Sequence, residues 1–174
     1  TTGLKGVGDL FGKAVRGKVT GESAIKPEYT GDGILVTEPT YRYILLEDLN
    51  DWNGSIVLDD GLFLASEASV KHKAVMRSNF SSAVAGGEGL FNLGLTGAGI
   101  VCLESNSPRE ELIEITMQND VVKIDGNMAI AWSGSLEFTV ERSGKTLLGS
   151  AASGEGLVNV YRGTGKVLLA PVAR

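Results

Sequence analysis

The sequence predicts an all-β fold of repeated antiparallel units, arranged as a sandwich or barrel, with at most short helical segments. Residues 136–141 alternate apolar and polar side chains, which places one strand face in a core and the other in water. Asn53-Gly54, Asp60-Gly61 and Asp125-Gly126 are short-turn signals, because glycine accepts the positive φ that tight hairpins need. A recurring glycine framework is the third observation.

Glycine is unusually frequent in this chain of 174 residues, with 24 glycines against only 4 prolines. That is about twice ordinary glycine usage. The low proline content argues against a disordered Pro/Gly-rich chain, and the absence of a repeating Gly-X-Y pattern argues against collagen. Apolar residues make up 43% and charged residues 21%, so the chain has enough apolar surface to fold without disulfides. The excess glycine therefore has a structural role.

The glycines mark an internal repeat. Gly21-Glu22 recurs as Gly87-Glu88 and as Gly154-Glu155, at offsets of 66 and 67 residues. Each copy is followed by a second glycine pair and then by an apolar run typical of a β-strand. The pairs are Gly31 and Gly33, Gly97 and Gly99, and Gly163 and Gly165; the runs are residues 34–36, 100–103 and 167–169. The simplest explanation is duplication of a β unit, with the glycine pairs at its corners.

The repeat divides the chain into three parts of one compact, pseudo-symmetric unit. We predict a partial first repeat over residues 1–47, a second over 48–106 and a third over 107–174. The first copy contains only the second half of a unit. We therefore expect a strand-rich half unit that is missing upstream or encoded outside this chain.

Two segments carry helical signals. Ser107-Pro108-Arg109-Glu110 has the composition of a helix start, but residues 113–117 then alternate with β-branched side chains. We predict a turn at 106–110 and a strand from 111. Residues 4–15 follow helical spacing, which three glycines weaken.

Charge and cysteine content narrow the class of protein. Against 21 acidic residues there are 16 basic ones, so the net charge of −5 makes nucleic acid an unlikely partner. The one cysteine, Cys102, has no internal disulfide partner, which suits a reducing, cytoplasmic location. Because it lies in an apolar strand-like run, we expect it to be a buried small hydrophobe. No apolar run is long enough to span a membrane, and no signal peptide is visible.

The sequence contains few residues that could support catalysis. His72 is the only histidine, so imidazole-rich metal sites cannot be assembled from one chain, and no G-x-S-x-G elbow accompanies it. Because His72 lies between Lys71 and Lys73, we expect it to be a solvated surface residue. We expect no enzyme activity, no cofactor and no metal.

Two further motifs fail on their spacing. Gly144-Lys145-Thr146 resembles the end of a phosphate-binding loop, but Thr139 stands where that motif needs glycine. The acidic cluster at 47–51 lacks the glycine of a calcium loop, so a solvated turn is the better interpretation.

Glu22, Glu88 and Glu155 recur at one place in each unit. A set of three carboxylates suggests either a site or a turn-stabilising role. Recurrence in every repeat favours the second interpretation, in which each carboxylate accepts hydrogen bonds from backbone N–H groups of the neighbouring glycine turn.

Five stretches together resemble the "altered inheritance of mitochondria" (mitochondrial biogenesis) family, in its mostly uncharacterised bacterial branch. They are residues 60–65, 86–91, 95–101, 154–158 and 161–169. The resemblance implies three β units in a double-stranded β-helix-like fold, grouped with the tryptophan RNA-binding attenuation protein. It implies no established catalytic activity and no catalytic residues. Fungal members are linked to mitochondrial inner-membrane organisation, and full members are longer at the N-terminus.

Three functions follow as hypotheses. The leading one is a non-enzymatic β scaffold that forms a homo-oligomer or binds a protein partner or a membrane surface, because apolar glycine-rich segments precede each Gly-Glu block. The second is a small-ligand-binding β-barrel with a pocket lined by Trp52 or Trp132. The third is RNA binding by analogy with the attenuation protein, which the net charge opposes.

Overall fold

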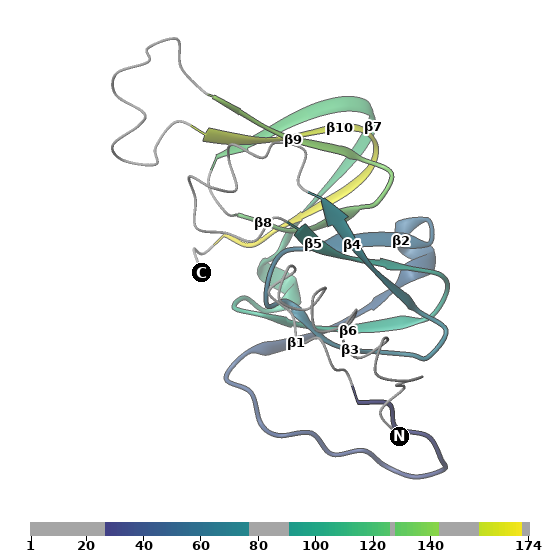
Figure 1. The fold of residues 1–174 in the computed structure, drawn as a ribbon. Helices are drawn as coiled ribbons and strands as arrows, with labels where there is room; N and C mark the ends of the chain where they lie inside the picture. The colour runs from purple at the N-terminus through teal and green to yellow at the C-terminus, as the bar shows by residue number, and fades with distance from the viewer. Residues whose placement is uncertain (1–26, 77–90, 126–127, 143–156, 172–174) are drawn as a thin grey trace.

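The computed structural model describes residues 27–76, 91–125, 128–142 and 157–171, which form β-strands and two short 3-10 helices (Figure 1). The elements are β1 Tyr43–Asp48, η1 Leu49–Trp52, β2 Ser55–Leu58, β3 Phe63–Ser66, β4 Lys71–Met76, β5 Phe91–Thr96, β6 Ile100–Ser105, η2 Arg109–Glu111, β7 Ile113–Asp125, β8 Ala129–Ser133, β9 Glu137–Arg142 and β10 Leu157–Leu169.

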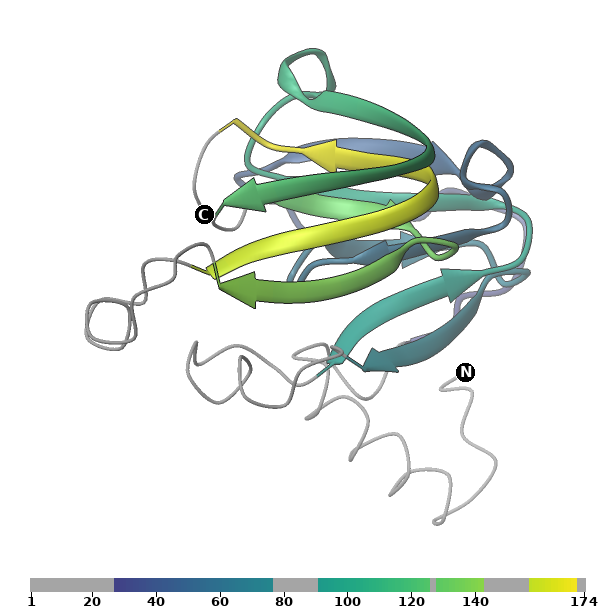
Figure 2. The same cartoon turned by 90° about the horizontal axis from the view of Figure 1, so that it is seen from above.

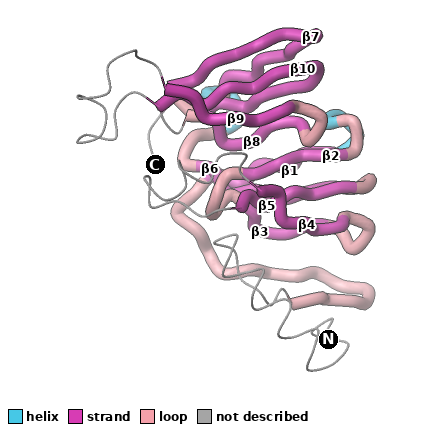
Figure 3. The backbone as a smooth tube through the Cα atoms, turned by 45° about the horizontal axis from the view of Figure 1, so that its top comes forward, coloured by secondary structure: helices cyan, strands magenta, loops and turns pink. Residues whose placement is uncertain are grey.

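The strands form two antiparallel sheets. One has three strands in the order β1-β6-β3, and the other has seven, in the order β4-β5-β2-β8-β10-β7 with β9 beside β10. Figure 3 shows the strands stacked side by side along the molecule. The prediction of an all-β, antiparallel, sandwich-like fold with only short helical segments is confirmed.

A central layer of β2, β8 and the last part of β10 is buried on both faces. Adjacent residues of β2 therefore point into different cores: Ile56 and Leu58 into one, Val57 into the other. The first core lies against the three-stranded sheet, with Leu45 and Leu103 among its members. Such near-continuous apolar strands are typical of a sheet that is covered on both sides.

The second core forms because β10 bends. Its first part, residues 157–162, pairs with β9, whereas residues 167–169 pair with β8. On its other side, β10 pairs with β7 along both parts. The long curved strand is yellow in Figure 2. The register shifts between Gly163 and Gly165, and Gly163 has a φ of +121°. Hydroxyl groups satisfy the irregular backbone there, since Lys166 N donates to Ser133 Oγ at 2.9 Å and Asn119 N to Thr164 Oγ1 at 2.9 Å.

The glycine pair at 97–99 lies where the chain passes from one sheet to the other. β5 belongs to the seven-stranded sheet and β6 to the three-stranded sheet. Gly97 has a φ of +123° and Gly99 a φ of +134°, both in the region that favours glycine. Gly97 N donates to Gly54 O at 3.0 Å, which ties the corner to the turn after η1. The internal repeat and the three-part division of the chain stay predictions.

The structure also tests three local expectations. The apolar run 34–36 is not a strand, because nothing pairs with it among the described residues and it lies in an exposed segment, 27–42. Asp60-Gly61 is a turn, but it leads from β2 in one sheet to β3 in the other, so it closes no hairpin. The turn before β7 is present, and the strand begins at Ile113 rather than 111 because η2 occupies residues 109–111. The helical pattern at 4–15 and part of Asp125-Gly126 lie outside the described residues.

Candidate assembly surface

The outer face of the three-stranded sheet is apolar where it is formed by β1. Ile44 is 49% exposed and Leu46 is 70% exposed, whereas Leu45 between them is buried in the core. The β1–β6 register places Leu46 beside Cys102 and Ile44 beside Glu104. A solvated face of an antiparallel sheet is ordinarily polar. The three consecutive apolar residues 44–46 were a usable signal, because a strand without alternation indicates that both of its faces are covered.

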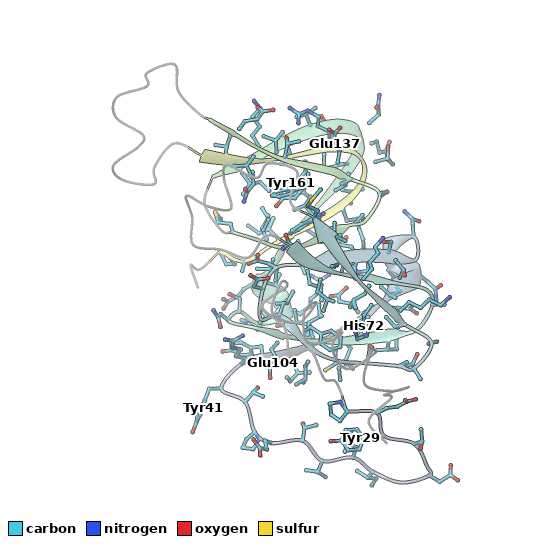
Figure 4. The ribbon with its side chains drawn as sticks, viewed as in Figure 1. Tyr29, Tyr41, His72, Glu104, Glu137 and Tyr161 are labelled. Atoms are coloured by element: carbon cyan, nitrogen blue, oxygen red, sulfur yellow. The ribbon has the colours of Figure 1, made fainter. Side chains whose placement is uncertain are left out.

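The segment that leads into β1 adds to this apolar surface. Eight of the thirteen exposed large apolar side chains in the described part of the chain fall within residues 29–46. Figure 4 shows Tyr29 and Tyr41 along the loop that enters β1. We call this set the assembly surface: Tyr29, Ile34, Leu35, Val36, Tyr41, Tyr43, Ile44 and Leu46. Concentrations of exposed apolar side chains mark interaction sites.

The backbone of β1 pairs with a described strand on one side only. Leu49 N donates to Gly99 O at 3.0 Å, directly in line with the β1–β6 register. Because bonding alternates along an antiparallel pair, Leu45 and Glu47 direct their N–H and C=O groups to β6, and Ile44 and Leu46 direct theirs outward. No described strand pairs with β1 on that outward side. The assembly surface therefore includes an open sheet edge.

Cys102 lies on the same outer face and corrects the expectation that it is buried. It is half-buried, because Val101 and Leu103 occupy the inward positions of β6. Burial raises the pKa of the Cys102 thiol, and the nearby Glu104 carboxylate raises it further. The thiol is therefore held in its protonated, weakly nucleophilic form at neutral pH.

Replacing Glu104→Gln should accelerate alkylation of Cys102. Removing the carboxylate lowers the thiol pKa, so the thiolate fraction and the rate with iodoacetamide at pH 8 should rise about two- to fourfold. Glu110→Gln, in the exposed η2 helix, is the matched control and should leave the rate unchanged. An equal rate for Glu104→Gln and the wild type would contradict the electrostatic assignment.

A charged network lies on the opposite side of β1. Glu47 is buried and accepts a hydrogen bond from Trp52 Nε1 at 3.0 Å, and its second oxygen lies 3.3 Å from Arg109 Nε. Glu114 binds Arg109 at 3.0 Å and Lys166 at 3.5 Å, and Lys166 Nζ lies 4.7 Å from the centre of the Trp52 ring. The network joins β1, η1, η2, β7 and β10, so its role is structural.

This network corrects the interpretation of residues 47–51 as a solvated turn. Asp48 caps η1 by accepting from Asn50 N at 2.9 Å, and the helix turns Leu49 and Trp52 into the core. Glu47 is buried with them. Arg109 and Lys166 were not found from the sequence, because each is distant along the chain and no local pattern marks it.

The predicted glycines that the structure describes lie at three separate places. Glu22, Glu88 and Glu155 lie outside the described residues, and Gly31 and Gly33 form a bend in segment 27–42. Gly97 and Gly99 lie at the corner between the sheets, and Gly163 and Gly165 at the bend of β10.

A carboxylate does support one glycine corner, but it is Glu67. Its Oε2 accepts from Ile100 N at 2.9 Å, next to Gly99. The two residues are 33 positions apart, so no local motif predicts the contact.

The remaining candidates are accounted for by packing. His72 is exposed on β4, as predicted, with Ser66 Oγ 3.0 Å from its Nε2 and the Phe63 ring beside it. Trp52 and Trp132 are both buried, and Trp132 packs on Phe138. Gly144-Lys145-Thr146 lies outside the described residues. Within the described ranges, no three His, Cys, Asp or Glu residues group as metal ligands.

Fold and surface together define an all-β sandwich protein with an exposed apolar sheet edge. Residues 1–172 match the family described as "Mitochondrial biogenesis AIM24", and the chain belongs to that family. The family membership that the sequence predicted is thereby confirmed, and the grouping with the attenuation protein stays a prediction.

Two streptococcal proteins are similar to it. An uncharacterised protein of Streptococcus pyogenes serotype M6 is 31% identical over 168 residues, which are 94% of this chain and 65% of the relative. The chain thus spans about two thirds of that relative's length. The crystal structure of protein SPYM3_0169 from Streptococcus pyogenes superposes with a TM-score of 0.61 at 25% identity, covering 99% of this chain and 75% of the other. In the described part of the chain, no helix has the length and apolar character needed to cross a membrane.

Proposed function

We propose that this protein is a non-enzymatic, cytoplasmic β scaffold that assembles through the assembly surface. The observation that carries the proposal is the coincidence of an apolar outer face with an open backbone edge on β1, at Ile44 and Leu46. Apolar side chains beside unpaired strand groups are the features that β-strand addition uses for affinity.

The chemistry of this edge favours a protein partner over a lipid surface. The outward N–H and C=O groups of β1 need hydrogen-bond partners, which acyl chains do not supply. The net charge of −5 also gives no general attraction to anionic headgroups.

The two alternatives gain no specific support. A ligand-binding module would need an open cavity beside Trp52 or Trp132, and both indoles are packed against their neighbours. RNA binding is opposed by the same net charge, and the two exposed lysines of β4, Lys71 and Lys73, form only a short basic stretch on one strand.

Size-exclusion chromatography with light scattering tests the proposal. We expect a mass above that of the 18.3 kDa chain. Co-sedimentation with vesicles of phosphatidylcholine and phosphatidylglycerol tests the lipid alternative in the same preparation. Binding to the vesicles would show that the surface contacts a membrane and not a protein partner. A strict monomer that binds neither itself nor another protein would refute the scaffold function.

A further inference from the structure

We infer that β1 pairs antiparallel with β1 of a second copy of this chain, about a two-fold axis at Leu45. The inference rests on the proposed assembly function and names its partner and register. It joins two three-stranded sheets into one continuous sheet in the order β3-β6-β1-β1-β6-β3.

The backbone geometry permits this register. In antiparallel pairing, two residues that exchange hydrogen bonds must both direct their N–H and C=O groups across the interface. Ile44, Leu46 and Asp48 are the β1 residues whose groups point away from β6. Centring the axis on Leu45 places Ile44 of each copy opposite Leu46 of the other, so the outward N–H and C=O groups of these four residues meet one another across the interface.

The side chains are self-complementary in the same register. Ile44 and Leu46, which are 49% and 70% exposed, become cross-strand apolar neighbours on the outer face. Arg42 of each copy falls opposite Asp48 of the other, so opposite charges close both ends of the pair. Arg42 Nη1 donates to Gly61 O at 2.9 Å and Asp48 Oδ1 accepts from Asn50 N, which leaves both groups further bonding capacity.

Two other described edge strands, β4 and β3, are less suited to such pairing. β4 carries Lys71 and Lys73, and edge lysines oppose strand addition. β3 is only four residues long. β1 combines an uncharged stretch, residues 43–46, with opposite charges placed on either side of it. A closed two-fold contact is also the commonest form of homo-oligomer.

Analytical ultracentrifugation of the whole chain tests the inference. The wild type should form a dimer, and Leu46→Pro should raise its dissociation constant at least tenfold. Proline at this position removes an N–H group that points outward, and it leaves the hydrogen bonds between β1 and β6 in place. The double variant Ile44→Lys/Leu46→Lys should do the same without altering the backbone, since it sets lysines opposite one another across the interface. Ile113→Lys, at an equally exposed position on β7, is the matched control and should leave the dimer intact.

A charge exchange tests the register itself. Arg42→Glu places like charges opposite each other and should weaken the dimer, whereas adding Asp48→Lys should restore it. Far-ultraviolet circular dichroism verifies the fold of every variant.

The outcomes separate the inference from the proposed function. A wild-type oligomer that is insensitive to the β1 variants would overturn the inference and leave the scaffold function standing. A wild-type chain that stays monomeric at all concentrations, or that pairs residues 34–36 with its own β1, would also overturn it. A dimer that the charge exchange fails to restore would overturn the register.

Discussion

Trp52→Ala is expected to lower the free energy of unfolding by about 3–5 kcal/mol. Trp52 is 1% exposed, and its removal leaves a large cavity in the core beside the three-stranded sheet. It also removes the Nε1 donor from the buried Glu47 carboxylate, which makes the loss larger than that of apolar surface alone. Urea unfolding followed by circular dichroism measures the change.

Two controls separate these contributions. Trp52→Phe retains most of the ring but not the donor, so its loss should be nearer to about 1–2 kcal/mol. Tyr41→Ala, at a fully exposed aromatic of the assembly surface, should change the monomer's stability by less than about 0.5 kcal/mol. Equal losses for Trp52→Ala and Tyr41→Ala would show that Trp52 is not part of the core.

Gly97→Ala should cost about 2–4 kcal/mol, because two effects coincide at this residue. Its φ of +123° is unfavourable for any residue with a Cβ, and a Cβ built there would lie 3.0 Å from the backbone oxygen of Ser69. Since the obstacle is backbone, a rotamer change cannot relieve it. The free energy of unfolding in urea and the thermal midpoint should both fall.

Gly31→Ala is the matched control for the glycine conformation. Gly31 has a φ of +137°, but nothing lies within 4 Å of a Cβ built there, and its segment is exposed. We expect a change of less than about 1 kcal/mol, since the open segment can adjust its dihedral angles. A loss at Gly31 equal to that at Gly97 would show that conformation alone, and not the crowded corner, sets the cost.

The sequence predicted those features that depend on neighbours along the chain. Alternation at 136–141 predicted a strand, and β9 occupies Glu137–Arg142. The two faces are less distinct than the pattern predicted, because residues 138–141 are all half-buried. The turn before β7 was predictable for the same reason, because Pro108 restricts the backbone locally at the start of η2.

Features set by distant pairing were not predictable in this way. The run 34–36 has strand composition, but a strand needs a partner, and composition does not supply one. Cys102 lies in an apolar run, yet the β1–β6 register decides which side of the sheet it occupies. The Glu47–Arg109–Glu114–Lys166 network likewise exists only because η2, β7 and β10 meet near η1.

The position of β10 has a consequence for synthesis on the ribosome. It pairs with β7, β8 and β9, all of which precede it in the sequence. At roughly 5–20 residues per second, several seconds separate the emergence of β7 from that of the strand that completes it. The three-stranded sheet, whose strands all end by Ser105, has its partners much sooner. Nascent chains stalled before residue 157 should therefore expose apolar strands of the larger sheet, which makes them substrates for chaperones and proteases during translation.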